Sequence, residues 1–215
     1  MQRDPDGRLL VVTESSFLIN FLAIDRMDIL GGLGQFKFHV VDHVTAEIRY
    51  PDQQARLRAA LAAGIVSEFE ITDPVEILLY DELRKVLGDG ESASLAVAVS
   101  RRWIIAADEK GRFRKELFER IGEDYLLDTP GALLAAIKSR VISISEAEEL
   151  REALRRHRFE MKGGKGDRLL FNFIPGPPRA LTVLCRPRRL AISSCHHEAP
   201  NGRWRLTHSR STVNS

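Results

Sequence analysis

Four acidic residues end apolar segments or open helical ones, at positions where carboxylates could bind a divalent metal ion. They are Glu14 after LLVVT, Glu47 in VVDHVTAE, Glu91 in GDGES and Asp108 after WIIAA. In a mostly parallel α/β sheet, ligands bind in the crevice outside the carboxyl ends of the strands. Each acid alone has an ordinary explanation as a solvated surface group or a helix cap. The four together favour a metal site more strongly than any one of them does.

Apolar segments of strand length alternate with helical patterns before residue 163. We expect strands at 9–13, 37–41, 103–107 and 124–128, and a short edge strand at 66–71. The segments between them place apolar residues three and four positions apart, as amphipathic helices do. This order predicts an α/β fold, with a central, mostly parallel sheet flanked by helices in a three-layer sandwich.

Two helix starts are predicted from short-range capping patterns. Thr129 is expected to cap a helix whose first residue is Pro130. Ser145 and Glu148 are expected to form a capping box for the helix that runs towards His157. The folded domain should therefore end in two helices.

Charge and composition divide the chain near residue 162. The 215 residues have a formal net charge of +2 and a hydrophobic content of 44%, which is enough to bury a core. Residues 163–215 carry nine Lys or Arg against two acids, and five of the nine prolines, without sustained periodicity. We predict a folded domain at 1–162 and a basic, disordered extension at 163–215. The extension either contacts nucleic acid or is an out-of-frame or read-through product without a selected function.

Several classes of protein are disfavoured by the same composition. No apolar run is long enough to cross a bilayer, and MQRDPDGRLL lacks the apolar core of a signal peptide, so we expect a cytoplasmic protein without a membrane partner. The first cysteine is Cys185, which argues against a disulfide framework in the main fold. The glycines of LGGLGQF do not have the context of a dinucleotide loop, and the C-terminal Cys and His residues lack zinc-finger spacing.

The sequence resembles the PIN-domain nucleases, especially the short toxin-like prokaryotic ones, from about residue 9 to residue 161. VVTESSFLINFLAIDRMDIL resembles the opening strand, acid, hydroxyl pair and helix of that family, and FHVVDHVTAEI resembles its second acid. GDGESASLAVAVSRRWIIAADEKGRFR is the most specific part, with an acid opening a helix of small residues, a buried strand, another acid and a basic helix. LLDTPGALLAAIKSRVIS resembles the family's ending.

The resemblance implies a PIN-like fold and a ribonuclease that uses Mg²⁺ or Mn²⁺. The catalytic acids would be Glu14, Glu47, Glu91 and Asp108, and the metal ligands Glu14, Glu91 and Asp108. Mg²⁺ prefers oxygen ligands, and crowded carboxylates repel one another unless a cation neutralises them. The metal would orient a water and offset phosphate charge, without a covalent intermediate. The first acid of this family is typically aspartate, so the longer Glu14 could weaken catalysis.

Other residues are candidates for holding RNA or for completing the acidic cluster. Ser16 stands where the family places a hydroxyl facing metal or phosphate, but it could equally cap a helix. Arg112 and Arg114 open a basic helix and could bind RNA phosphates, or they could form an ordinary solvated surface. Asp42 and Asp128 also follow apolar runs, as extra carboxylates or as turn and cap residues.

The leading functional hypothesis is a metal-dependent endoribonuclease that is the toxin of a toxin–antitoxin pair. RNA would be its substrate, an antitoxin its protein partner, and a homodimer its oligomeric state. The antitoxin would bind an apolar groove between the helices at 15–24 and 42–62 and insert a basic side chain among the acids. The alternative is a PIN-fold regulator with weak or no catalysis that binds RNA or a protein. A phosphotransfer receiver is more distant, because no lysine stands at the required strand end.

Overall fold

A five-stranded, wholly parallel sheet forms the centre of the fold. The computed structural model describes residues 1–157 and 159, so the predicted extension at 163–215 lies outside the described residues. The strands are β1 (Leu9–Thr13), β2 (Phe36–Val41), β3 (Val66–Phe69), β4 (Ile104–Ala106) and β5 (Leu126–Leu127). Their order across the sheet is β3-β2-β1-β4-β5, so β1 is the central strand.

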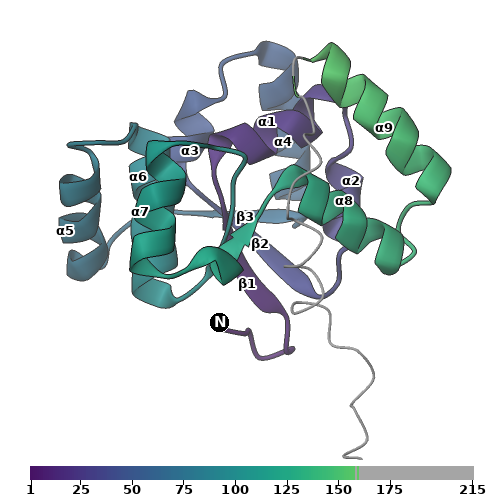
Figure 1. Cartoon of the computed structure of the whole chain (residues 1–215). Coiled ribbons are helices and arrows are strands. Elements are labelled where there is room, and N and C mark those ends of the chain that lie inside the picture. The colour runs from purple at the N-terminus through teal and green to yellow at the C-terminus, as the bar shows by residue number, and fades with distance from the viewer. Residues whose placement is uncertain (158, 160–215) are drawn as a thin grey trace, which may run out of the picture. The chain divides into compact units, whose positions relative to one another are not determined.

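Helices cover both faces of this sheet (Figure 1). Those of the described residues are α1 (Ser15–Ala23), α2 (Met27–Gly32), α3 (Asp42–Glu47), α4 (Pro51–Ala62), α5 (Pro74–Leu83), α6 (Asp89–Arg101), α7 (Arg112–Arg120), α8 (Thr129–Lys138) and α9 (Ile144–Arg156). Helices α5, α6 and α7 pack on one face, and α1, α2, α4, α8 and α9 on the other. The predicted three-layer α/β sandwich is confirmed.

Alternation along the strands builds a separate apolar core on each face of the sheet, because successive strand side chains point to opposite sides. Val11 and Phe38 belong to one core, and Val12 and Ile105 belong to the other. Strand β1 is buried at all of its positions. This is expected of a central parallel strand with helices on both faces.

The predicted strands lie where the structure has them, with small differences at their ends. β4 is shorter than the predicted 103–107. The predicted strand at 124–128 is reduced to β5, because a 3₁₀ helix at Glu123–Tyr125 precedes it. Gly122 starts that helix with φ of 96°, a conformation that glycine adopts at little cost. β3 lies at an edge of the sheet, as predicted.

The predicted cap of α8 is wrong by one residue. Asp128 is the cap, since its carboxylate accepts the N–H of Gly131 at 2.9 Å, and Thr129 is the first helical residue. A carboxylate at this position also interacts favourably with the positive end of the helix dipole. The Thr129 hydroxyl is thereby free to make a different contact, described below.

The predicted capping box of α9 is wrong by two residues. The box consists of Ser143 and Glu146 rather than Ser145 and Glu148. Both pairs have the same Ser-x-x-Glu spacing, so the local pattern could not separate them. The earlier start adds helical residues before Leu150 and Leu154, which α9 buries against the core.

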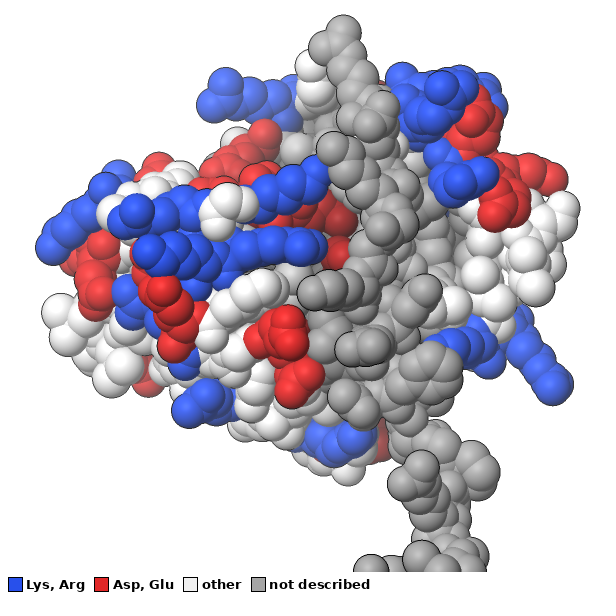
Figure 2. Space-filling view, in the orientation of Figure 1, with Lys and Arg blue, Asp and Glu red and all other residues white. Residues whose placement is uncertain are grey.

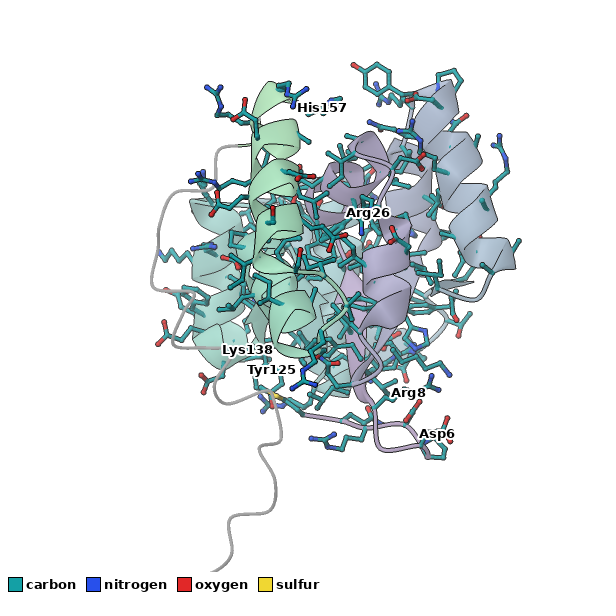
Figure 3. The ribbon with its side chains drawn as sticks, turned by 90° about the vertical axis from the view of Figure 1, so that its right-hand side faces the viewer. Asp6, Arg8, Arg26, Tyr125, Lys138 and His157 are labelled. Atoms are coloured by element: carbon teal, nitrogen blue, oxygen red, sulfur yellow. The ribbon has the colours of Figure 1, made fainter. Side chains whose placement is uncertain are left out.

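The amino end of the sheet carries a loop held by ion pairs. At the amino end, the loop before β1 is closed by Arg8, which pairs with Asp4 at 2.8 Å and Asp6 at 2.9 Å. Figure 3 labels Asp6 and Arg8 on this loop and His157 at the far end of α9.

None of the described helices is both long and apolar enough to cross a bilayer.

Helices α1 and α4, which border the groove predicted for an antitoxin, are joined by Arg56. Its guanidinium donates to the carbonyl oxygens of Leu22 at 2.6 Å and Ala23 at 3.3 Å, and it pairs with Asp25 at 3.2 Å. These carbonyls belong to the last turn of α1, where a cation satisfies groups left without helical partners. The groove itself remains a prediction.

Candidate acidic site at the carboxyl ends of the strands

The candidate site lies where the strand order reverses. The chain runs outward from β1 to β2 and β3, and then crosses to β4 on the other side of β1. Such a reversal leaves a crevice at the carboxyl ends of β1 and β4, where α/β folds bind ligands. Thr13 is in register with Ala106, and the N–H of Glu14 donates to the Ala106 carbonyl oxygen at 2.9 Å. Glu14 and Asp108 therefore leave adjacent strands at the same edge.

The Glu14 side chain turns back onto the start of α1 and is 1% exposed. Its carboxylate accepts hydrogen bonds from the Ser15 hydroxyl at 2.6 Å, from the Ser16 N–H at 2.7 Å and from the Ser16 hydroxyl. Burial raises the pKa of Glu14 above its ordinary value, while these hydrogen bonds oppose the rise. Glu14 is thus both a site acid and the N-cap of α1.

Ser16 connects the two strand ends. Its hydroxyl donates to the Glu14 carboxylate and accepts the backbone N–H of Asp108 at 3.0 Å. Since Glu14 caps α1, the sequence-based alternative of Ser16 as a cap is not what the structure has. The Ser16 hydroxyl contacts Glu14 and the backbone of Asp108, and its proposed role towards metal or phosphate stays a prediction.

Asp108 is held by donors from two helices. Thr129, at the start of α8, donates its N–H to Oδ1 at 3.0 Å and its hydroxyl to Oδ2. Asn20 of α1 donates its amide to Oδ2 at 2.9 Å. Burial raises the pKa of Asp108 to about 6, with a further contribution from the nearby Asp128 carboxylate, while the Thr129 and Asn20 hydrogen bonds oppose it.

The first turn of α6 holds the other two predicted acids. Glu47, the last residue of α3, accepts the Gly90 N–H through Oε1 at 2.9 Å. Glu91 accepts the Gly88 N–H through Oε2 at 2.9 Å and so satisfies the backbone donor of the residue that precedes α6. Both carboxylates lie at the positive end of the helix dipole, which stabilises their charge. Two acids far apart in the sequence are thereby brought to one helix end.

Glu109 is a site acid that sequence reasoning missed. Burial raises its pKa, and so do the charges of Glu91 and Asp108. The charge of Glu109 in turn raises the pKa of Glu14. Glu109 therefore shares its electrostatic environment with three of the four predicted acids. The signal was present in the sequence as a second acid directly after Asp108.

Asn20 and Thr129 were also missed as residues that support the site. Asn20 lies four positions after Ser16, so the two share one face of α1. Asn20 also donates to the Thr129 hydroxyl at 3.3 Å, which links α1 to α8 beside Asp108. Thr129 could have been found from its place directly after the last strand and Asp128.

The two extra carboxylates have the turn and cap roles that the sequence left open. Asp42 opens α3 and accepts from the N–H of His43 at 2.9 Å, and lies 2.7 Å from its Nδ1. Asp128 caps α8 and pairs with Arg114 at 3.5 Å. Asp128 nevertheless contributes to the site, because its charge acts on Asp108.

A basic surface borders the acidic one. Figure 2 shows Lys and Arg side chains gathered over α7 next to a group of acids. Arg112 is 56% exposed at its side chain and pairs with Glu116 at 3.2 Å. Arg114 is more constrained, because it pairs with Asp128 and its Nε donates to the Glu109 carbonyl oxygen at 3.0 Å. The two arginines therefore have different surroundings.

The charge of the site suits a divalent cation. Glu14, Asp108 and Glu109 are acids with raised pKa values, and a cation would offset their burial and mutual repulsion. Oxygen donors are also the ligands that Mg²⁺ and Mn²⁺ prefer. Within residues 1–157 and 159, however, no three Asp, Glu, His or Cys residues are placed to hold one metal ion. The predicted carboxylates instead accept hydrogen bonds from nearby protein groups.

Residues 10–162, which make up more than half of the chain, match the sequence model of a family described as a PIN domain. The matched segment contains all four predicted acids together with Asn20, Glu109 and Thr129. No curated protein was found that matches the chain.

Proposed function

The chain belongs to the PIN-domain family, and we propose that it is a metal-dependent endoribonuclease, the toxin component of a toxin–antitoxin pair. PIN domains are generally nucleases, so hydrolysis of a nucleic acid is the activity expected of the fold. The observation that carries the proposal is the Ser16 bridge, which joins Glu14 and Asp108 at the reversal of the strand order. Glu47 and Glu91 add carboxylates from the start of α6.

Each part of the site has a role in the proposed reaction. Glu14, Glu91 and Asp108 would hold Mg²⁺ or Mn²⁺ once their carboxylates turn from their present hydrogen bonds towards one ion, and the bound ion would supply positive charge that activates water and offsets the charge on phosphate oxygens. Thr129 and Asn20 orient the Asp108 carboxylate through three donors. Such supporting hydrogen bonds are needed because small displacements of a reacting group cost large factors in rate.

RNA must be held against the repulsion of the acids, and the basic residues of α7 are suited to this. Arg112 is largely exposed, so its guanidinium can reach a phosphate. Binding that relies on such contacts weakens as salt concentration rises, because counterions are released from the polyanion. The antitoxin partner and the homodimer rest on the resemblance to short PIN proteins.

The function is tested by cleavage of a mixed-sequence, partly single-stranded RNA by the full chain with Mg²⁺, Mn²⁺ or EDTA. We expect cutting with either metal, none with EDTA, and none by Asp108→Asn. A DNA strand of the same sequence tests the choice of RNA. A folded protein that leaves the RNA intact with both metals contradicts the proposal.

A second candidate function is a PIN-fold regulator without catalysis, which binds RNA or a protein. The observation that favours it is the set of three donors that turn the Glu14 carboxylate towards the start of α1. Under this alternative, Glu14→Asp would not create cleavage, and RNA binding would persist in EDTA. Cutting by the unmodified chain would reject it.

A further inference from the structure

We propose that Gly90 is a positioning residue for Glu47, because the absence of a side chain at position 90 leaves the space that the Glu47 carboxylate occupies. The proposal rests on the proposed function, which includes Glu47 among the catalytic acids. Gly90 would act through Glu47 alone, without touching RNA or metal.

The contact between the two residues is close. The Gly90 N–H donates to Glu47 Oε1 at 2.9 Å. A Cβ atom at position 90 would lie 2.6 Å from Oε2, 2.7 Å from Cδ and 2.8 Å from Oε1 of Glu47. Carbon atoms pack best at about 3.5–4.0 Å, so even a methyl group would displace the whole carboxylate.

Backbone conformation does not explain a glycine here. The described glycines with positive φ are Gly7, Gly64, Gly111 and Gly122, and Gly90 is not among them. It occupies the second position of α6, and within a helix alanine is favoured over glycine by about 1 kcal/mol. Helix stability thus disfavours the residue that is present, whereas the approach of Glu47 requires it.

The contact also decides where Glu47 points. Glu47 ends a short helix. Among the described residues, the Gly90 N–H is the group that donates a hydrogen bond to its carboxylate. The same turn of α6 carries Glu91, whose carboxylate is fixed by Gly88. Gly90 therefore brings the Glu47 carboxylate to the turn of α6 that also carries Glu91, without any side chain of its own.

The experiment compares Gly90→Ala with Gly34→Ala in the full chain. Gly34 is the control, because a Cβ there would meet no atom within 4 Å, its φ is not positive, and it lies outside the candidate site. Calorimetry measures the Mn²⁺ affinity of each variant. Thermal unfolding in EDTA measures the unfolding temperature of each variant without metal. Glu47 would support the proposed ligand Glu91 at the same turn of α6 rather than bind the ion itself, so we expect Gly90→Ala to weaken Mn²⁺ binding by about tenfold, as loss of a supporting group does, without lowering the unfolding temperature. Gly34→Ala should leave Mn²⁺ affinity unchanged.

The same pair is then made in a Glu47→Gln background. If Gly90 acts through Glu47, Gly90→Ala should cause no further loss of Mn²⁺ affinity there. Wild-type Mn²⁺ affinity in Gly90→Ala, or an equal loss in the Glu47→Gln background, would overturn the proposal.

One NMR measurement separates this proposal from the proposed function. Glu47→Gln should shift the Gly90 amide resonance of the metal-free protein, because it removes the charge that this N–H contacts. If the wild-type protein binds no Mn²⁺, the proposed function fails, and a shifted resonance still supports the positioning contact. An unshifted resonance overturns the contact whether or not metal binds.

Discussion

The Ser16 hydroxyl oxygen accepts the backbone N–H of Asp108 at 3.0 Å, although 92 positions separate the two residues. The same hydroxyl donates to the Glu14 carboxylate. One side chain therefore satisfies a backbone donor beyond the end of β4 and an acid at the end of β1. The Ser16 hydroxyl thereby links Glu14 and Asp108 in addition to the pairing of β1 with β4.

Ser16→Ala should lower the free energy of unfolding by about 1–2 kcal/mol, because it leaves the Asp108 N–H without its acceptor and removes a donor to Glu14. Ser15→Ala is the control, since the Ser15 hydroxyl donates to Glu14 but the structure gives it no bond to Asp108. Urea unfolding measures both. Equal losses in the two variants would show that the link to Asp108 does not matter.

Asp108→Asn should abolish RNA cleavage and yet raise the free energy of unfolding in EDTA at pH 7. The pKa of Asp108 is raised to about 6, so the folded state disfavours the charged carboxylate relative to the unfolded chain. Removing that charge should raise the free energy of unfolding by on the order of 1 kcal/mol, after subtraction of the hydrogen bonds from Thr129 or Asn20 that the amide nitrogen cannot accept. Thermal unfolding beside the exposed variant Asp124→Asn checks this. A destabilised Asp108→Asn would contradict it.

The two candidate RNA-binding arginines should behave differently. Arg112→Ala should weaken RNA binding and make it less sensitive to salt, with little change in stability, because Arg112 is largely exposed. Arg114→Ala should lower stability, because it loses its contacts with Asp128 and Glu109. Fluorescence anisotropy at several salt concentrations and urea unfolding distinguish the two. Unchanged RNA affinity in Arg112→Ala would exclude Arg112 from the binding surface.

His39 is a half-buried histidine whose protonation the fold opposes. Its ring lies 4.8 Å from the Trp103 ring, and its Nε2 is buried without a hydrogen-bond partner among the described residues. Burial lowers the pKa of His39 to about 4, the charges of Lys37 and Arg101 lower it too, and Asp4 opposes them.

Because the folded-state pKa of His39 lies below its ordinary value of 6.5, the stability it contributes is present above pH 6.5 and is lost as pH falls towards about 4. His39→Phe should remove this loss of stability. From pH 7.5 to pH 4.5, the free energy of unfolding of the variant should therefore rise by about 1 kcal/mol relative to that of the wild type, a value already reduced because His39 is partly exposed. Urea unfolding at both pH values measures the difference. If the difference in free energy of unfolding between variant and wild type is the same at both pH values, the lowered pKa of His39 is contradicted.

Periodicity in the sequence was sufficient to predict the three-layer fold and the strands within a few residues, because burial on both faces makes β1 and β4 continuously apolar. Local sequence patterns predicted the wrong residues where two candidate capping boxes had the same spacing. Ser143 and Ser145 each stand three residues before a glutamate, and the structure uses Ser143 with Glu146.

The supporting residues of the site could not be predicted in the same way. Asn20 reaches Asp108 across 88 positions and Thr129 across 21, so neither contact has a local pattern. Glu109 was visible as an acid, but its importance depends on how close Glu14 and Glu91 lie.

The sequence by itself determined that acids follow β1 and β4, because the apolar runs set where each strand ends. Glu14 turns to its next neighbours Ser15 and Ser16, which is a local contact at the start of α1. Only the tertiary structure decided that Asp108 meets Asn20 and Thr129, and that Glu47, at the end of α3, turns to the space beside Gly90. The physical reason is that a buried carboxylate must find hydrogen-bond donors. For Glu47, packing of α3 against α6 brings the donor from a distant segment.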